Sequence, residues 1–149
     1  MKNIQNYEYR PDLFYHPVDH YWLERRGEVL RIGLDSLIQE SMGNFVGIQL
    51  KKPGTSLKAG ESMGSLEAEK HVAHLRAPVS GTIQQINPQL AQTPSLINTD
   101  AYENGWILEI EPTDFEGEKQ HFLTGEQAVK PWFESEIKKY REKEWLAEP

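Results

Sequence analysis

Short runs of alternating apolar and polar residues recur along the chain, which is the pattern of strands with one buried face. Residues 21–26 and 29–34 form two such runs, and Arg26-Gly27 between them is an ordinary hairpin connection. Turn signals at Pro53-Gly54 and Ala59-Gly60 precede another pair of runs. The remaining strand patterns cover residues 45–50, 62–68, 72–75, 82–86 and 106–110. The chain is therefore predicted to be rich in short strands.

Two segments have helical periodicity instead. Asp35 can cap a short helix that runs to Met42 and ends at Gly43. Pro131 can occupy the first turn of a C-terminal helix, because the missing amide costs nothing there. That helix would bury one apolar stripe, made of Phe133, Ile137 and Tyr140. Its dense charges predict a solvated remainder, and Trp132 and Trp145 are assigned to packing.

The chain shows no shift of composition that would mark a second unit. Residues 1–12 are polar without an apolar period, and they predict an extended arm. Residues 13–149 then form one domain, which is long enough to bury a substantial core.

Lys70 is the candidate for chemistry. It lies between the runs at 62–68 and 72–75, and a Pro-x-x-Gly turn follows eight residues later at Pro78. A lysine at the tip of a hairpin can enter a modifying ligase in extended form, and its modified arm can reach distant active sites. Gly64 permits close packing at the base of this hairpin. A solvated lysine in an ordinary hairpin is the simpler alternative, because short motifs match by chance.

The segment resembles the modification site of lipoyl-carrier and biotin-carrier domains, where the modified lysine precedes a Pro-x-x-Gly turn at the same distance. Glu69 is similar to the acidic residue that commonly precedes a lipoylated lysine. Biotin carriers flank their lysine with methionines, and this chain has Glu69 and His71 instead. The resemblance implies covalent lipoate on Lys70 as the cofactor.

Other segments resemble the glycine cleavage H-protein family over residues 15–111. These are His20-Tyr21-Trp22 near the start, Leu96-Ile97-Asn98, Tyr102 and Gly105-Trp106. Simple lipoyl domains of the 2-oxoacid dehydrogenases lack Leu96-Ile97-Asn98, Tyr102 and Gly105-Trp106 after the lysine hairpin. The resemblance implies a mainly β fold with flanking helices (α+β), built as a flattened β-barrel sandwich hybrid with a C-terminal helix. It also implies a carrier protein and not an enzyme.

The cleft that shields the loaded arm in H proteins contains a Glu, a His and an Asp. At the matching positions this chain has Tyr21, Ser41 and His74, so the carboxylates that would recognise a cationic amine are missing. His71, His74 and Arg76 make the stretch after Lys70 basic, which favours an anionic cargo or an acidic partner. Glu67 and Glu69 complete the candidate recognition residues.

With these departures the chain resembles the lipoate-binding proteins of bacterial sulfur oxidation, and the segment at residues 12–17 resembles them as well. The first hypothesis is therefore a carrier of thiol-bound sulfur that works with a heterodisulfide-reductase-like complex and dihydrolipoamide dehydrogenase. The alternative is an H protein that shuttles an aminomethyl group among the glycine cleavage P, T and L proteins. Either carrier needs a lipoate ligase or lipoyl transferase. A third hypothesis is an unmodified interaction module.

The composition of the chain excludes several other classes of function. The net charge of −7 argues against binding nucleic acid, and no apolar run is long enough for a membrane span or a signal peptide. We expect a cytoplasmic protein. With no cysteine, the chain has no disulfide, thiolate zinc site or thiol nucleophile of its own. The histidines lack metal-binding spacing, so no metal site is expected, and the pair His71 and His74 is assigned to the solvated surface.

Overall fold

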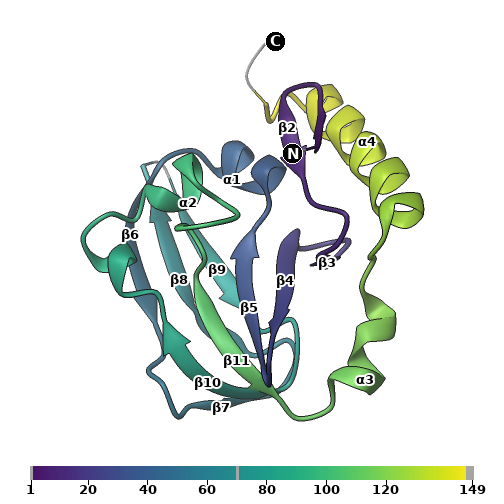
Figure 1. The fold of residues 1–149 in the computed structure, drawn as a ribbon. Helices are drawn as coiled ribbons and strands as arrows, with labels where there is room; N and C mark the ends of the chain where they lie inside the picture. Colours follow the sequence, from purple (N-terminus) through teal and green to yellow (C-terminus); the bar gives the residue numbers. More distant parts are fainter. Residues whose placement is uncertain (1, 70, 147–149) are drawn as a thin grey trace.

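Two antiparallel sheets share one apolar core in the computed structural model, which describes residues 2–69 and 71–146 (Figure 1). The larger sheet has the order β3 (Phe14–Tyr15), β4 (Tyr21–Arg26), β5 (Val29–Leu34), β11 (Leu108–Pro112), β10 (Gly81–Ile86) and β7 (Ser56–Leu57). The smaller sheet has the order β6 (Phe45–Leu50), β8 (Ser62–Ala68) and β9 (Val72–Arg76). The predicted mainly β sandwich with flanking helices is confirmed.

The predicted strand ranges are close to the observed ones. β4 and β5 coincide with the predicted hairpin and pair in register from Tyr21 opposite Leu34 to Arg26 opposite Val29. β11 begins at Leu108, two residues later than predicted. The carbonyl of Trp106 instead accepts a hydrogen bond from the Asn87 side chain, at 2.7 Å, so this residue belongs to the preceding loop.

The predicted lysine hairpin is the β8–β9 pair, in which Glu67 lies opposite Val72. Gly64 has φ +141°, and a Cβ atom there would lie 2.1 Å from the backbone oxygen of Gln49 on β6. Only glycine therefore allows β6 and β8 to approach this closely without a shift. Lys70 follows β8 and precedes β9 in the sequence, and it lies outside the described residues.

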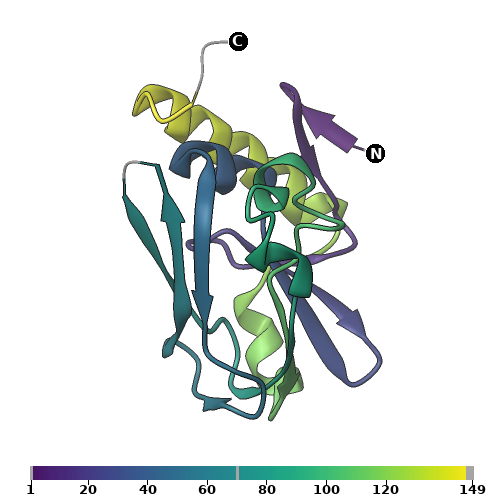
Figure 2. The same ribbon diagram turned by 90° about the vertical axis from the view of Figure 1, so that its left-hand side faces the viewer.

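The short helices lie in the connections. They are α1 (Ser36–Met42), η1 (Pro88–Ala91), α2 (Leu96–Thr99), α3 (Phe115–Glu118) and η2 (Lys119–His121). The first of them was predicted: Asp35 accepts hydrogen bonds from the amides of Leu37 and Ile38, and Gly43 ends the helix with φ +86°. α1 lies at the same end of the molecule as the end of β8 and the start of β9 (Figure 2).

The N-terminal residues differ from the extended arm that their polarity predicts. β1 (Lys2–Ile4) and β2 (Tyr7–Tyr9) pair as a hairpin, with left-handed backbone at Gln5 and Asn6 in the turn. Tyr7 and Tyr9 are buried, and the Tyr9 ring lies 5.6 Å from that of Phe133. Tyrosine rings supply an apolar face while their hydroxyls bond carboxylates, so a polar-looking segment still packs.

The C-terminal helix α4 (Glu126–Glu142) also begins earlier than predicted. Pro131 lies inside the helix and not in its first turn, because the helix starts directly after Gly125. The predicted stripe of Phe133, Ile137 and Tyr140 is confirmed as buried, and Val129 extends it by one turn. In Figure 1 the helix runs beside the β1–β2 hairpin, which supplies part of its packing surface.

A buried ion network joins α4 to the rest of the fold. The His20 ring is fully buried, and its Nδ1 lies 2.7 Å from Asp35 Oδ2 while its Nε2 lies 2.8 Å from Glu136 Oε1. Both acceptors are carboxylates, so both nitrogens must carry a proton and the ring is an imidazolium. Burial lowers the pKa of His20, but the two carboxylates more than offset this effect and raise the pKa to about 9. We call His20, Asp35 and Glu136 the His20 cluster.

The His20 cluster predicts a loss of stability in alkaline solution. Because the folded pKa is raised from 6.5 to about 9, the stabilisation is fully present below pH 6.5 and is lost as the pH rises through about 9. We expect the free energy of unfolding to fall by about 3 kcal/mol over this window, in urea titrations at successive pH values.

The Glu136→Gln variant is the control for this titration. It keeps a hydrogen-bond acceptor but removes one carboxylate, so its pH-dependent loss should be smaller than that of the original chain. An equal loss in both proteins would show that another group titrates.

Candidate functional site

A cavity of about 180 Å³ lies between the free edge of β9 and the surfaces of β4 and α1. Apolar side chains make most of its walls, and polar side chains from β9 and from the segment before β4 complete it. The lining residues are Val18, Asp19, Tyr21, Leu34, Ile38, Met42, His74, Leu75 and Arg76. The cavity therefore runs along the strand that directly follows the candidate lysine in the sequence.

Tyr21 forms a link between the two sheets beside this cavity. Its ring is buried, and its hydroxyl accepts a hydrogen bond of 2.9 Å from the backbone amide of Arg76 at the free edge of β9. Burial raises the pKa of Tyr21 to about 12, so the hydroxyl is neutral at physiological pH. The sequence predicts Tyr21 as a cleft residue, and the structure adds a role in joining β4 to β9.

The structure brings only some of the predicted recognition residues to the cavity. Tyr21 and His74 both line it. Ser41 does not, because its hydroxyl donates to the backbone oxygen of Ile38 within α1. Glu67 is exposed on β8, opposite Val72, and is not among the lining residues.

Glu69 and His71 lie at the end of the hairpin, next to the candidate lysine in the sequence. Both are exposed. The amide of Glu69 donates to the oxygen of Asn44, and the oxygen of His71 accepts from the amide of Ala68. Their backbones are thus held by neighbouring residues while their side chains face solvent. Val46 and Val72 add exposed apolar side chains on the same sheet.

Asp19 is a cavity residue that the sequence analysis missed. Its amide and that of Val18 donate to His16 Nδ1, at 3.0 and 3.3 Å, which orders the segment before β4. Burial lowers the pKa of His16, in keeping with this acceptor role. Asp19 places a carboxylate at a cavity that was expected to lack one. Its position next to His20-Tyr21-Trp22 was the available signal.

Asn98 and Tyr102, which carry part of the family resemblance, act through packing and backbone hydrogen bonds. Asn98 accepts from the amide of Phe45 and donates to the oxygen of Gly43, which fixes the connection from α1 to β6. Tyr102 packs against Trp22 with the ring centroids 5.9 Å apart. These residues support the walls around the cavity and do not line it.

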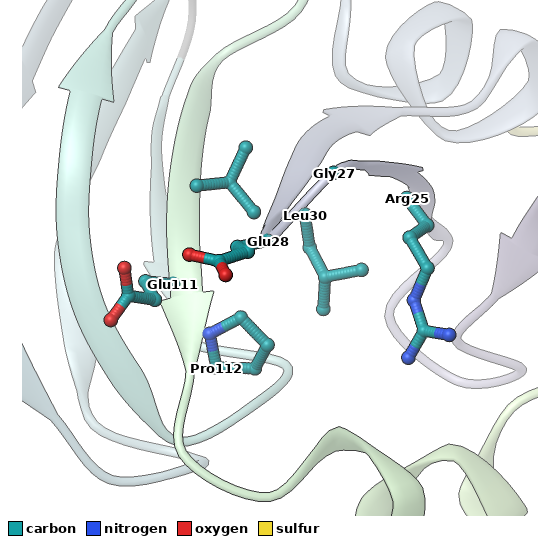
Figure 3. A pocket seen from close by; sticks show the side chains of 7 residues that line it. Arg25, Gly27, Glu28, Leu30, Glu111 and Pro112 are labelled. Atoms are coloured by element: carbon teal, nitrogen blue, oxygen red, sulfur yellow. The ribbon is translucent and has the colours of Figure 1, made fainter.

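A second hollow, of about 460 Å³, lies at the β4–β5 turn, at the opposite end of β5 from α1 (Figure 1). Figure 3 shows Glu28 and Glu111 on one side of it and Arg25 on the other. The Arg25 guanidinium is paired with Glu116 at 3.3 Å and lies 4.9 Å from the ring centre of Phe115. This hollow lies at the other end of the molecule from the end of β8 and the start of β9, which argues against a role in holding an arm on Lys70.

The cavity along β9 fits a flexible alkyl arm that ends in a polar group. Leu34, Ile38, Met42 and Leu75 can cover methylene groups, while Asp19, His74 and Arg76 offer charged or hydrogen-bonding partners at the end. Among the residues the structure describes, no group of three or more suitable side chains could hold a metal ion. No described helix has both the length and the apolar character needed to cross a membrane.

Replacing Tyr21 by Phe should destabilise the protein by about 1–2 kcal/mol, because the amide of Arg76 would lose its acceptor in a partly buried setting. Urea denaturation measures this change. Tyr140→Phe is the matched control, since the Tyr140 hydroxyl has no hydrogen-bond partner within the described part of the chain and should cost less. Equal costs for the two variants would contradict the role given to Tyr21.

Comparison with known proteins identifies the family. The family model described as glycine cleavage H-protein matches residues 14–135. A glycine cleavage system H protein of Mycobacterium avium is 41% identical over 105 residues, which are 70% of this chain and 79% of that protein. That of Geobacillus thermodenitrificans is 38% identical over 109 residues, or 73% and 85% of the two chains.

A solved structure agrees with these matches. The crystal structure of a glycine cleavage system H protein from Mycobacterium marinum superimposes with a TM-score of 0.70 at 30% identity, covering 86% of this chain and 98% of the other. Sequence, fold and extent of the match all agree, and the chain belongs to the glycine cleavage H-protein family.

Proposed function

We propose that this chain is a lipoyl carrier of the glycine cleavage system, with the lipoyl group in amide linkage to Lys70. Proteins of its family are non-catalytic carriers that hold lipoate covalently on a lysine. The observation that carries the assignment to Lys70 is the place of this residue in the sequence, between the paired strands β8 and β9 of a family member. The carrier would work in the cytoplasm with the P, T and L proteins after modification by a lipoate ligase or lipoyl transferase.

Lipoate supplies the chemistry through a dithiolane that can be opened to hold a transferred group. The protein supplies a rigid body and a place of shelter. Ile38, Met42 and Leu75 would contact the methylene groups of the arm and keep water from the cargo. The carboxylate of Asp19 would face a cationic amine at the end of the arm, and its charge favours that cargo.

Asp19 and the similar proteins together favour aminomethyl carriage over sulfur carriage. The sequence alone favours sulfur carriage, because carboxylates are missing at the positions of Tyr21 and His74. The carboxylate of Asp19 supports an amine as cargo, and the similar proteins named above are glycine cleavage H proteins. The aminomethyl carrier therefore becomes the first proposal.

Sulfur carriage stays as the second candidate because of one observation. His74 and Arg76 line the same cavity as Asp19, and Arg76 is a permanent cation. An anionic thiol-bound cargo would pair with this end of the cavity. The carrier would then serve a heterodisulfide-reductase-like complex and dihydrolipoamide dehydrogenase. The two proposals predict opposite signs of charge at the end of the arm.

Intact mass tests the carrier role. Co-expression with a lipoate ligase should add one lipoyl group, and Lys70→Arg should abolish the addition. Lys58→Arg is the matched control, since Lys58 is an exposed lysine before β8, and it should leave the addition unchanged. The absence of any addition to the original chain would overturn the carrier proposal and favour the unmodified interaction module.

Charge substitutions test the cargo. In the lipoylated protein loaded from glycine by the P protein, Asp19→Asn should shorten the half-life of the aminomethyl form about two- to fivefold, the size of one partly exposed ion pair. Glu111→Gln, at the far hollow, is the charge-matched control and should have no effect.

A different set of results would favour sulfur as the cargo. If the P protein does not load the original chain, while a heterodisulfide-reductase-like complex loads it with sulfur and Arg76→Gln weakens that loading, the sulfur-carrying candidate replaces the first proposal. A Glu111→Gln effect equal to that of Asp19→Asn would mean that net charge, and not the cavity, matters.

A further inference from the structure

The segment from His16 to His20 forms one wall of the cavity. Val18 and Asp19 line the cavity from this segment, and 76% of the Val18 surface is exposed. The segment ends at His20, whose backbone has φ +63°, a left-handed conformation that costs energy for a residue other than glycine. Such a conformation persists only where surrounding contacts hold it in place.

Contacts from α4 hold this wall on one side. Glu136 accepts a hydrogen bond of 2.8 Å from His20 Nε2, and the indole nitrogen of Trp132 donates to the oxygen of Pro17 at 3.2 Å. The rings of Trp132 and Tyr140 lie 5.0 and 5.3 Å from the His20 ring. The C-terminal helix therefore touches the beginning and the end of the segment that carries Val18 and Asp19.

Contacts from α1 hold the same wall on the other side. Asp35 Oδ2 accepts from His20 Nδ1 at 2.7 Å, while its Oδ1 accepts from the amides of Leu37 and Ile38. The backbone amide of Asp35 also donates to the oxygen of His20, at 3.0 Å. Ile38 and Met42 of α1 also line the cavity, so the His20 ring links the segment that carries Val18 and Asp19 to the start of the helix that carries Ile38 and Met42.

We propose that α4, acting through Glu136 and the buried His20 ring, positions the two walls of the cavity and so determines how long the loaded arm is retained. His20, Asp35 and Glu136 are positioning residues in this account, since none of them lines the cavity. The inference rests on the proposed carrier function for its retention step. The positioning step concerns the unmodified protein and can be measured without lipoate.

The first experiment measures amide hydrogen exchange in the unmodified protein. Glu136→Ala should speed exchange at Val18 and Asp19 about tenfold, because their hydrogen bonds to His16 depend on the position of the segment. Exchange in the β4–β5 ladder should stay unchanged. Glu136→Gln keeps an acceptor for His20 and should restore most of the protection.

Glu134→Ala is the matched control, since Glu134 lies on the exposed side of the same helix. It loses the same charge and the same side-chain atoms, so it should leave exchange at Val18 and Asp19 as it is. Equal effects of Glu134→Ala and Glu136→Ala, or no effect of Glu136→Ala, would overturn the positioning role.

The second experiment measures the half-life of the aminomethyl-loaded form by intact mass. Glu136→Ala should shorten it about threefold, in proportion to a more open wall, while the amount of lipoyl group attached stays the same. A faster exchange without a shorter half-life would overturn the inference and leave the carrier function intact. Failure of the original chain to accept lipoate would instead overturn the carrier function, with the exchange result still deciding the positioning role.

Discussion

The buried imidazolium of His20 satisfies two carboxylates at once, and three distant parts of the chain meet at this ring. Asp35 caps the start of α1, Glu136 lies in the C-terminal helix, and His20 lies directly before β4. Removing the ring would leave two carboxylates without their cation in a buried setting, which typically costs about 3–5 kcal/mol. The helices and the larger sheet are therefore held together by a charge that none of them could bury alone.

The candidate site lies along the edge of β9. The smaller sheet ends there, and Tyr21 reaches across from β4 to bond the amide of Arg76. The cavity that remains has apolar walls and carries Asp19, His74 and Arg76. A carrier needs little more from its protein part, because the reactive group belongs to the cofactor. The fold supplies paired strands before and after Lys70 in the sequence, and a cavity along the second of them.

Local pattern was enough to predict much of this architecture. The β4–β5 hairpin, α1 with its Asp35 cap, and the buried stripe of α4 all follow from contacts within a few residues. Other contacts join residues that are far apart in the sequence. Tyr9 with Glu126 and His20 with Glu136 are each separated by more than 100 residues, and Tyr7 with Glu40 by 33. No local periodicity indicates such pairs. His20 therefore entered the sequence analysis only as part of the family resemblance, without its partner Glu136, and Asp19 was not predicted at the cavity. Family resemblance predicts Tyr21, Ser41 and His74 as residues of one cleft; Tyr21 and His74 line the cavity along β9, and Ser41 is not among its lining residues.

We propose that the loaded arm on Lys70 lies in the cavity along β9. Solution NMR of the lipoylated, aminomethyl-loaded protein would detect this position through nuclear Overhauser contacts between the methylene groups of the arm and the side chains of Ile38, Met42 and Leu75. We expect such contacts in the loaded form, together with a shift of the Asp19 carboxylate signal. The absence of any contact with these three side chains in the loaded protein would show that the arm lies elsewhere.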